Sequence, residues 1–165
     1  MPLNLEAILD EIGARFKTVK TGLDIGFADE TVTETLRNFR GGTWMSINDG
    51  GDLPFDDDQF EVVVMNGGVI GKTAVKEANR VLKRDGCLFF SVPAKTRGQV
   101  GYTVQEIYRV IREGFDILSI RRPRWWWFGR KPKMFTVCAR KKSWRPHRSV
   151  FQNTSVPITT IRDHA

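Results

Sequence analysis

Histidine and cysteine are scarce in this sequence, which limits the metal sites it could build. The two histidines, His147 and His164, both lie near the C-terminal end. Cys87 and Cys138 lie inside the apolar runs CLFFSV and MFTVCA, a context typical of buried thiols rather than of a disulfide or metal pair. Zinc sites combine several His and Cys ligands, so we assign no metal ligand in this chain.

Long apolar runs are also absent. No stretch of about 18 or more apolar residues occurs, as a transmembrane helix would need. The first residues, MPLNLEAILDEIGARF, alternate charged with apolar side chains instead of forming a signal-peptide core. A chain of 165 residues lies in the usual range for one domain. We therefore expect a single globular domain in the cytoplasm.

Acidic residues are missing from one end of the chain. Residues 117–162 contain 12 Lys and Arg and no Asp or Glu, whereas residues 1–116 contain 14 Lys and Arg against 18 Asp and Glu. The net charge of +7 is thus a C-terminal property of an otherwise mildly acidic chain. This asymmetry indicates either an anionic partner for that end or a solvated basic tail.

Helix and strand patterns alternate along the chain. Apolar residues at helical spacing, capping residues and short β-branched runs identify the elements. Strands are expected at 21–25, 43–47, 60–65, 87–92, 115–120 and 134–139, and helices at 3–16, 29–40, 74–82 and 103–114. Such alternation predicts an α/β fold with a mostly parallel sheet and helices on both faces.

Two regions are expected outside the central α/β pattern. The helix within residues 1–19 should cover the core as an N-terminal addition to a domain of residues 1–142. Residues 143–165 show neither helical nor strand periodicity, which predicts a basic, extended tail.

Several segments resemble one enzyme family. They are GLDIGFAD, GGDLPFDDDQFEVVVMNG, EANRVLKRDGCLFFSVP, IREGFDILSI and MFTVCARK. In this order they resemble class I S-adenosylmethionine-dependent methyltransferases of the small-molecule, type 11-like kind, over roughly residues 20–142. The resemblance implies a Rossmann-like sheet with an antiparallel last strand and S-adenosylmethionine as cofactor. Because few residues separate the first loop from DLPF, one edge helix and strand unit is expected to be missing.

The resemblance also implies a cofactor site. Its first loop would supply Asp24, Gly26, Phe27 and Ala28, with Asp29 where the family has a small residue. The segment INDGGDLPF would place Asn48, Asp49 and Leu53 at the adenine end, so that the ribose-binding acid is missing or replaced. Asn66 and Gly67 would face the reacting methyl group. The competing interpretation is that the loop polar residues serve only as turn and cap residues.

A second motif follows the central strand. Residues 66–73 read NGGVIGKT, which differs at one position from the phosphate-binding pattern G-x-x-x-x-G-K-T. The segment lies between a strand and a helix, as that pattern requires. Because the first glycine is replaced by Asn66, a P-loop-like nucleotide binder is a less favoured hypothesis.

An aromatic and cationic loop occupies residues 121–133. An anionic membrane surface or RNA could meet such a loop, and a rigid hairpin end or homodimer contact is the competing interpretation. The contacting residues would be Arg121, Arg122, Arg124, Trp125, Trp126, Trp127, Arg130, Lys131 and Lys133. The contiguous tryptophans favour a peripheral membrane location over RNA.

Two classes of function follow from the sequence. The first is a methyltransferase acting on a small or lipid-linked acceptor, and the second is a non-catalytic interaction protein that keeps the fold without binding cofactor. An RNA-binding methyltransferase is a less favoured variant. No general base stands out, although Asn66, Lys95 and Tyr102 are within plausible reach of the methyl group. Methyl transfer does not always need a general base, since alignment of the acceptor alone can supply much of the catalysis.

Overall fold

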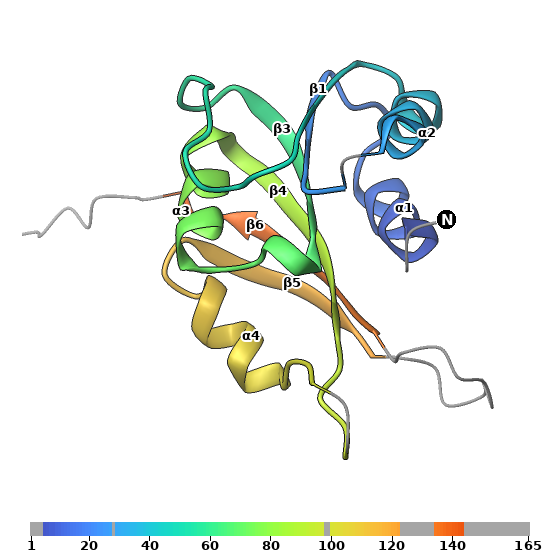
Figure 1. The fold of residues 1–165 in the computed structure, drawn as a ribbon. Coiled ribbons are helices and arrows are strands. Elements are labelled where there is room, and N and C mark those ends of the chain that lie inside the picture. The colour runs from blue at the N-terminus through green and yellow to red at the C-terminus, as the bar shows by residue number, and fades with distance from the viewer. Residues whose placement is uncertain (1–4, 28, 98–99, 123–133, 144–165) are drawn as a thin grey trace, which may run out of the picture.

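The computed structural model describes residues 5–27, 29–97, 100–122 and 134–143. Within these residues the chain forms six strands in one sheet with helices on both faces (Figure 1). The elements are α1 (Leu5–Arg15), β1 (Thr21–Ile25), α2 (Glu30–Arg40), β2 (Thr43–Ile47), β3 (Phe60–Asn66), the 3₁₀ helix η1 (Gly67–Val69), α3 (Lys72–Val81), β4 (Leu82–Pro93), α4 (Val104–Ile111), β5 (Phe115–Arg121) and β6 (Met134–Lys141).

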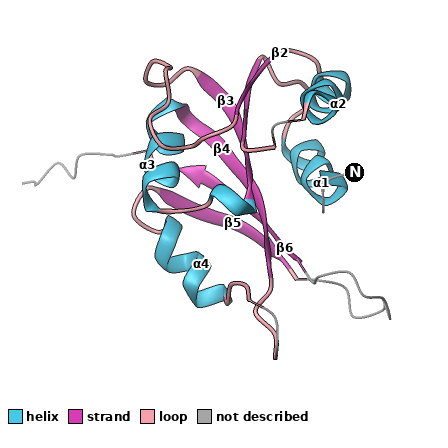
Figure 2. Cartoon of the chain, in the orientation of Figure 1, coloured by secondary structure: helices cyan, strands magenta, loops and turns pink. Residues whose placement is uncertain are grey.

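The strand order is β2-β1-β3-β4-β6-β5. The first four strands are parallel, and β6 runs antiparallel between β4 and β5. This topology confirms the predicted fold class, including the antiparallel last strand. The connection between β2 and β3, residues 48–59, contains neither a helix nor a strand (Figure 2), as expected for a chain that lacks one edge unit.

Two hydrophobic clusters lie on opposite faces of the sheet. Helices α1 and α2 cover one face, where Ile12 and Leu36 pack against β-strand residues such as Phe89. Helices α3 and α4 cover the other face around Phe90 and Ile111. The predicted burial of Cys87 and Cys138 is confirmed, because both are buried free thiols.

The boundary between α3 and β4 differs from the prediction. We expected Leu82 to be helical and the strand to begin at Cys87 after a turn, but β4 begins at Leu82. Its pairing with β3 jumps from Leu82 to Cys87, so residues 83–86 bulge out of the ladder, with Asp85 at φ 65°. Likewise α4 ends at Ile111, before the Gly114 at which we expected it to stop.

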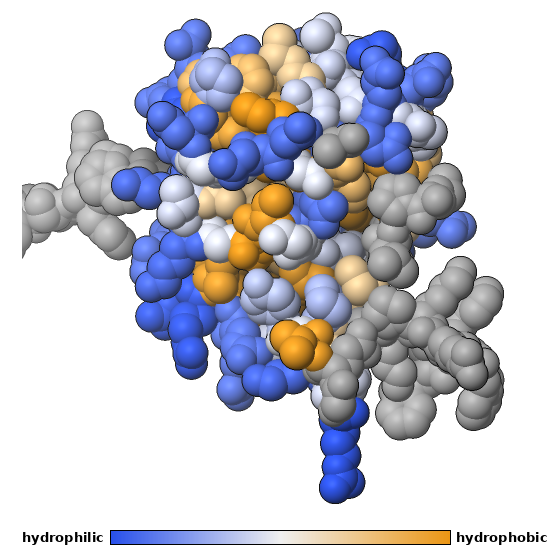
Figure 3. Space-filling view, viewed as in Figure 1, coloured by the Kyte–Doolittle hydropathy of each residue, from blue (hydrophilic) through white to orange (hydrophobic). Residues whose placement is uncertain are grey.

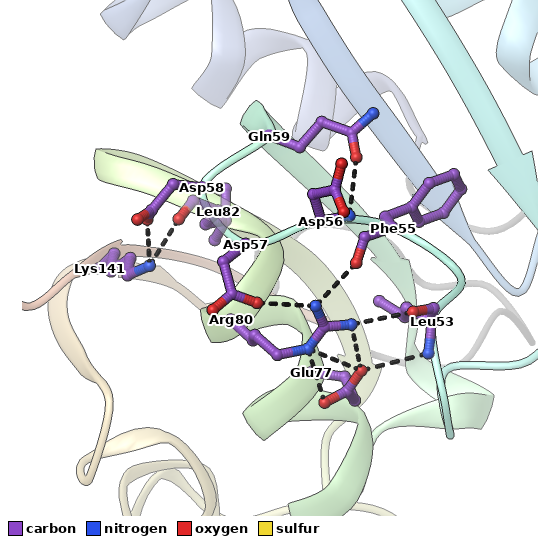
Figure 4. A network of polar contacts seen from close by, with 10 residues as sticks. All are labelled: Leu53, Phe55, Asp56, Asp57, Asp58, Gln59, Glu77, Arg80, Leu82 and Lys141. Carbon is purple, nitrogen blue, oxygen red and sulfur yellow. Dashed lines mark hydrogen bonds and ion pairs between the residues drawn. The ribbon is translucent and has the colours of Figure 1, made fainter.

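An arginine on α3 holds the connection between β2 and β3 in place (Figure 4). Arg80 donates hydrogen bonds to the carbonyl oxygens of Leu53, at 2.9 Å, and Phe55, at 2.7 Å. It also pairs with Glu77 and Asp57. Because these contacts satisfy loop carbonyls with a charged donor, the connection is fixed without a helix of its own.

A buried carboxylate fixes α1 against the far edge of the sheet. Glu11 is 2% exposed and accepts hydrogen bonds from Arg15, at 2.5 Å, and from Ser119 of β5, at 2.6 Å. The guanidinium of Arg121 also pairs with it. Burying a carboxylate is costly unless it is paired, so these partners are a requirement for this position of α1.

Candidate functional site

The candidate site lies where the carboxyl ends of β1, β2 and β3 meet. β1 pairs with β2 on one side and with β3 on the other. After β1 the chain adds β2 on one side of β1, and it later returns to add β3 on the other side of β1. Such a switch point in an open α/β sheet leaves a crevice outside the strand ends, where ligands bind.

Asp24 is the most unusual residue at this switch point. Its side chain is completely buried, and Oδ2 accepts hydrogen bonds from Thr33 of α2, at 3.1 Å, and Ser46 of β2, at 3.2 Å. Oδ1 has no hydrogen-bond partner among the described residues. A buried carboxylate oxygen without a partner costs free energy, so this atom marks a place where a donor is missing.

Burial raises the pKa of Asp24 to about 6. The hydroxyl groups of Thr33 and Ser46 act in the opposite direction without cancelling it. The nearby backbone N–H of Phe27 acts in the same direction more weakly, although it forms no hydrogen bond with Oδ1. Burial dominates because a desolvated carboxylate loses more favourable hydration than two hydroxyl donors return. A carboxylate of this kind would gain from a positively charged neighbour.

Gly26 connects the ends of three strands. Its N–H donates to the carbonyl oxygen of Ile47 on β2, at 2.7 Å, and its own carbonyl accepts from Nδ2 of Asn66 on β3, at 3.0 Å. Its φ of 81° favours glycine. A Cβ here would lie 2.8 Å from the side chain of Val69, so the missing side chain makes room for protein atoms of η1.

Asn66 shapes the loop that follows β3. While its Nδ2 donates to Gly26, its Oδ1 accepts from the N–H of Gly68, at 3.0 Å, and caps η1. A Cβ on Gly67 would lie 2.1 Å from the carbonyl oxygen of Ser91. Both predicted residues therefore lie at the crevice, but their visible contacts are structural.

The NGGVIGKT segment does not form a phosphate cradle. In a P-loop the backbone N–H groups of the loop point at phosphate oxygens. Here residues 67–69 form a 3₁₀ turn and the N–H of Gly68 is bonded to Asn66. Lys72 and Thr73 begin α3 instead.

The other predicted cofactor residues differ in their exposure and in the contacts they make. Asn48 and Asp49 are exposed immediately after β2, with Oδ1 of Asp49 accepting from the N–H of Gly51 at 3.1 Å. Leu53 is a core residue, 3% exposed, and its N–H donates to Glu77. Phe27 packs partly against the cluster under α1 and α2, and Ala28 lies outside the described residues. Asp29, as expected, caps α2.

The residues predicted near the methyl acceptor follow β4. Tyr102 donates its N–H to the carbonyl oxygen of Pro93, at 2.7 Å, and accepts from the N–H of Lys95, at 2.9 Å. The Lys95 ammonium lies 3.4 Å from Glu106. This pairing brings Tyr102 to the carboxyl end of β4, the strand that pairs with β3 and places Ser91 beside Asn66.

Thr33 and Ser46 were not predicted as site residues. Strand register places Ser46 directly beside Asp24, and Thr33 comes from the buried side of α2. The available signal was their polarity at positions where the periodicity calls for apolar side chains. That signal is weak, because threonine and serine are common in both helices and strands.

The structure describes little of the aromatic and cationic loop. Arg121 pairs with Glu11 and, at 3.6 Å, with Asp10, so its charge is already matched within the chain. Arg122 is exposed. Residues 123–133, with Arg124, the three tryptophans, Arg130, Lys131 and Lys133, lie outside the described residues, as does the tail from 144 to 165. Their proposed contacts with a membrane, RNA or a second copy stay predictions.

None of the helices that the structure describes has the length and apolar character needed to cross a membrane. No group of three or more His, Cys, Asp or Glu side chains among the described residues is arranged to hold a metal ion.

Comparison with known proteins identifies the fold. No protein-family model matches the sequence, and no curated protein matches it. A chain of the complex between the Haloferax volcanii Trm112 methyltransferase activator and a methyltransferase has a TM-score of 0.65 with 15% identity, over 86% of this chain and 90% of that one.

Two further solved structures contain S-adenosylhomocysteine. The N-methyltransferase NodS from Bradyrhizobium japonicum has a TM-score of 0.64 with 14% identity, covering 84% of this chain and 85% of that one. The 1,6-didemethyltoxoflavin-N1-methyltransferase from Burkholderia thailandensis has a TM-score of 0.63 with 15% identity, covering 85% and 79%. The chain described here therefore has the fold of class I S-adenosylmethionine-dependent methyltransferases.

Proposed function

We propose that this chain is an S-adenosylmethionine-dependent methyltransferase for a small or lipid-linked acceptor. The observation that carries the proposal is the buried Oδ1 of Asp24, which lacks a donor among the described residues at the switch point of a methyltransferase fold. Fold alone does not imply activity, so the crevice residues must also fit the cofactor.

Asp24 fits the cationic end of the cofactor. The amino-acid part of S-adenosylmethionine carries an ammonium group, which could donate to Oδ1 and would stabilise the charged form of this carboxylate. Since the pKa of Asp24 is about 6, the carboxylate is charged at neutral pH.

Asp49 fits the ribose hydroxyl groups. An acidic residue roughly 20 residues after the first loop, at the end of the adjacent strand, binds the ribose in dinucleotide-binding folds. Asp49 follows β2, the strand beside β1. The sequence pattern instead suggests the adenine end for Asp49. S-ribosylhomocysteine, which lacks adenine, distinguishes the two roles: Asp49→Ala weakens its binding only if this carboxylate contacts the ribose.

The bound cofactor would supply an activated methyl group on its sulfonium sulfur. The chain's own contribution would be to hold the acceptor in line with that methyl group, and such positioning can account for much of a rate enhancement. Asn66 and Tyr102, at the ends of β3 and β4, are the residues we assign to the acceptor side.

The acceptor class rests on analogy with the structural neighbours. The Burkholderia enzyme was solved with 1,6-didemethyltoxoflavin. A phosphoethanolamine N-methyltransferase from Haemonchus contortus, with 16% identity and a TM-score of 0.60 over 72% of this chain and 38% of that one, was solved with phosphomonomethylethanolamine. Both acceptors are small, which supports a small acceptor here. A lipid-linked acceptor is supported only by the composition of residues 121–133.

Calorimetric titration with S-adenosylhomocysteine tests the proposal. We expect saturable binding by the wild type, a raised unfolding midpoint, and at least about tenfold weaker binding by Asp24→Asn, since a charge-assisted hydrogen bond is worth more than 1.4 kcal/mol. Asp116→Asn, an exposed carboxylate on β5, is the matched control and should bind like the wild type. If the wild type does not bind S-adenosylhomocysteine at millimolar concentration, the proposal that this chain is a methyltransferase is refuted.

One observation favours the non-catalytic alternative. The space that a glycine loop normally leaves for a ligand is filled at Gly26 by Val69, and both polar atoms of the Asn66 amide are engaged by the backbone. Val69→Ala distinguishes the alternatives. It should strengthen ligand binding if Val69 occludes the crevice, and leave binding unchanged if the cofactor contacts lie elsewhere.

A further inference from the structure

A groove between α3 and α4 lies apart from the strand-end crevice. The two helices pack beside each other on the same face of the sheet (Figure 1). The groove has a volume of about 480 Å³, within the range of about 300–1,000 Å³ that is usual for small-molecule sites. It is lined by Lys72, Thr73, Val75, Lys76, Asn79, Arg109, Val110, Glu113 and Gly114.

Three cations face this groove without a counter-ion in the described part of the chain. Lys72 and Lys76 lie one turn apart on α3, and Arg109 lies opposite on α4. None of the three forms an ion pair of 4.0 Å or less with a described residue. Glu113 is the one carboxylate in the lining, and it does not pair with them either. The groove therefore carries a positive charge in an otherwise acidic part of the chain.

Apart from Thr73, the rest of the lining is apolar or closed. Val75 is 5% exposed and Val110 is half-buried, so both form the floor rather than the rim. Nδ2 of Asn79 donates to the carbonyl oxygen of Gly114, at 2.7 Å, and joins the two sides at one end. Figure 3 shows hydrophobic surface next to hydrophilic surface over α3 and α4. A ligand for this groove would thus need both an anionic group and an apolar part.

We propose that the groove between α3 and α4 binds an organic phosphate. Lysine ammonium groups bind phosphate as point charges, and an arginine guanidinium can donate two parallel hydrogen bonds to it. Lys72, Lys76 and Arg109 supply these groups, and the hydroxyl of Thr73 supplies a neutral donor. The apolar part of the ligand lies on Val75 and Val110. The Lys72–Thr73 pair of the NGGVIGKT segment thus serves this groove.

Phosphate fits the lining better than a carboxylate does. Three separate cations from two helices match a group with three terminal oxygens and a charge near −2 at neutral pH, whereas a carboxylate offers two oxygens and one charge. The inference does not depend on methyl transfer, because no residue of the strand-end crevice takes part. A chain that fails to bind S-adenosylhomocysteine can still pass the test below.

Titration of the full chain with phenyl phosphate, followed by backbone amide NMR, tests the proposal. We expect saturable shifts confined to residues 72–79 and 109–114. Arg109→Ala and Lys76→Ala should each weaken binding by about tenfold, as expected for a lost charge-assisted hydrogen bond. Arg37→Ala on α2 removes an exposed cation elsewhere and should leave the affinity unchanged.

Two other probes separate the parts of the ligand. Inorganic phosphate should bind the same residues more weakly than phenyl phosphate, and benzyl alcohol should cause no saturable shift. The proposal is overturned if phenyl phosphate does not saturate at millimolar concentration, if the shifts persist in Lys76→Ala and Arg109→Ala, or if benzyl alcohol reproduces them. Amide spectra of the free variants confirm that each substitution leaves the fold intact.

Discussion

Substitution of Asp24 by asparagine should make the protein more stable at neutral pH. The wild-type carboxylate is fully buried, and its Oδ1 has no hydrogen-bond partner among the described residues. The amide oxygen of asparagine can accept from Thr33 and Ser46 in place of Oδ2, and the amide nitrogen replaces the unpartnered Oδ1. The substitution therefore removes a buried charge while it keeps the shape and the two hydrogen bonds.

The size of the effect follows from the pKa of Asp24, which rises from 3.8 to about 6 on folding. Between these values the folded state holds more protons than the unfolded state, so the free energy of unfolding falls as the pH rises. At 1.36 kcal/mol per pKa unit the full difference is about 3 kcal/mol. Because the new amide N–H group also lacks a partner, we expect a gain of about 1–3 kcal/mol above pH 7 and none below about pH 4.

Urea unfolding at a series of pH values measures this difference. The stability of Asp24→Asn relative to the wild type should increase from about pH 4 to about pH 7 and then stay constant. Asp116→Asn, at an exposed position, should change stability by less than about 0.5 kcal/mol at every pH. If Asp24→Asn is destabilised equally at low and neutral pH, hydrogen bonding rather than charge burial controls this position, and the reasoning is wrong.

Three further substitutions test the contacts around the site, all by urea unfolding. Gly67→Ala should lower the free energy of unfolding by about 2 kcal/mol or more, because its Cβ would lie 2.1 Å from the carbonyl oxygen of Ser91. Gly68→Ala, where the Cβ would make only ordinary contacts, should lower it far less. Equal losses would contradict the close approach at Gly67. Thr103→Ala removes a capping box and should cost about 1 kcal/mol, and a neutral result would show that the box contributes nothing. Arg80→Lys should lower the free energy of unfolding by about 1–2 kcal/mol, because one ammonium cannot replace a guanidinium that bonds two loop carbonyls and two carboxylates. Wild-type stability would mean that the connection between β2 and β3 does not depend on these contacts.

Local signals in the sequence were sufficient to predict most of the helices and strands. The β-branched run at β3, Phe60–Asn66, and the caps of α2 and α4 depend only on residues a few positions apart. Asp29 does cap α2, accepting from the N–H of Thr31 at 2.9 Å, and Thr103 forms its box with Glu106. Periodicity and capping are properties of one element at a time, which is why they could be recognised without the structure.

Features that depend on pairing between distant segments could not be predicted. Residues 83–86 read as a turn before a strand, yet β4 begins at Leu82 because Leu82 pairs with Phe60 of β3. At the site, Asp24 was predicted, but its contact with Ser46 exists only through the register of β1 against β2. The packing of Val69 against Gly26 is likewise invisible in the sequence, and it bears directly on whether the crevice admits a ligand.

The position of β6 has a consequence for the order in which this sheet can be completed. Among the strands that the structure describes, β5 joins the sheet only through β6, and β6 fills the gap between β5 and β4. During synthesis, until residues 134–141 emerge, β4 has one unpaired edge and β5 has no strand to pair with. An unpaired, apolar edge is where chains associate wrongly. Truncation before Met134 should therefore produce aggregation, rather than a smaller sheet that folds normally.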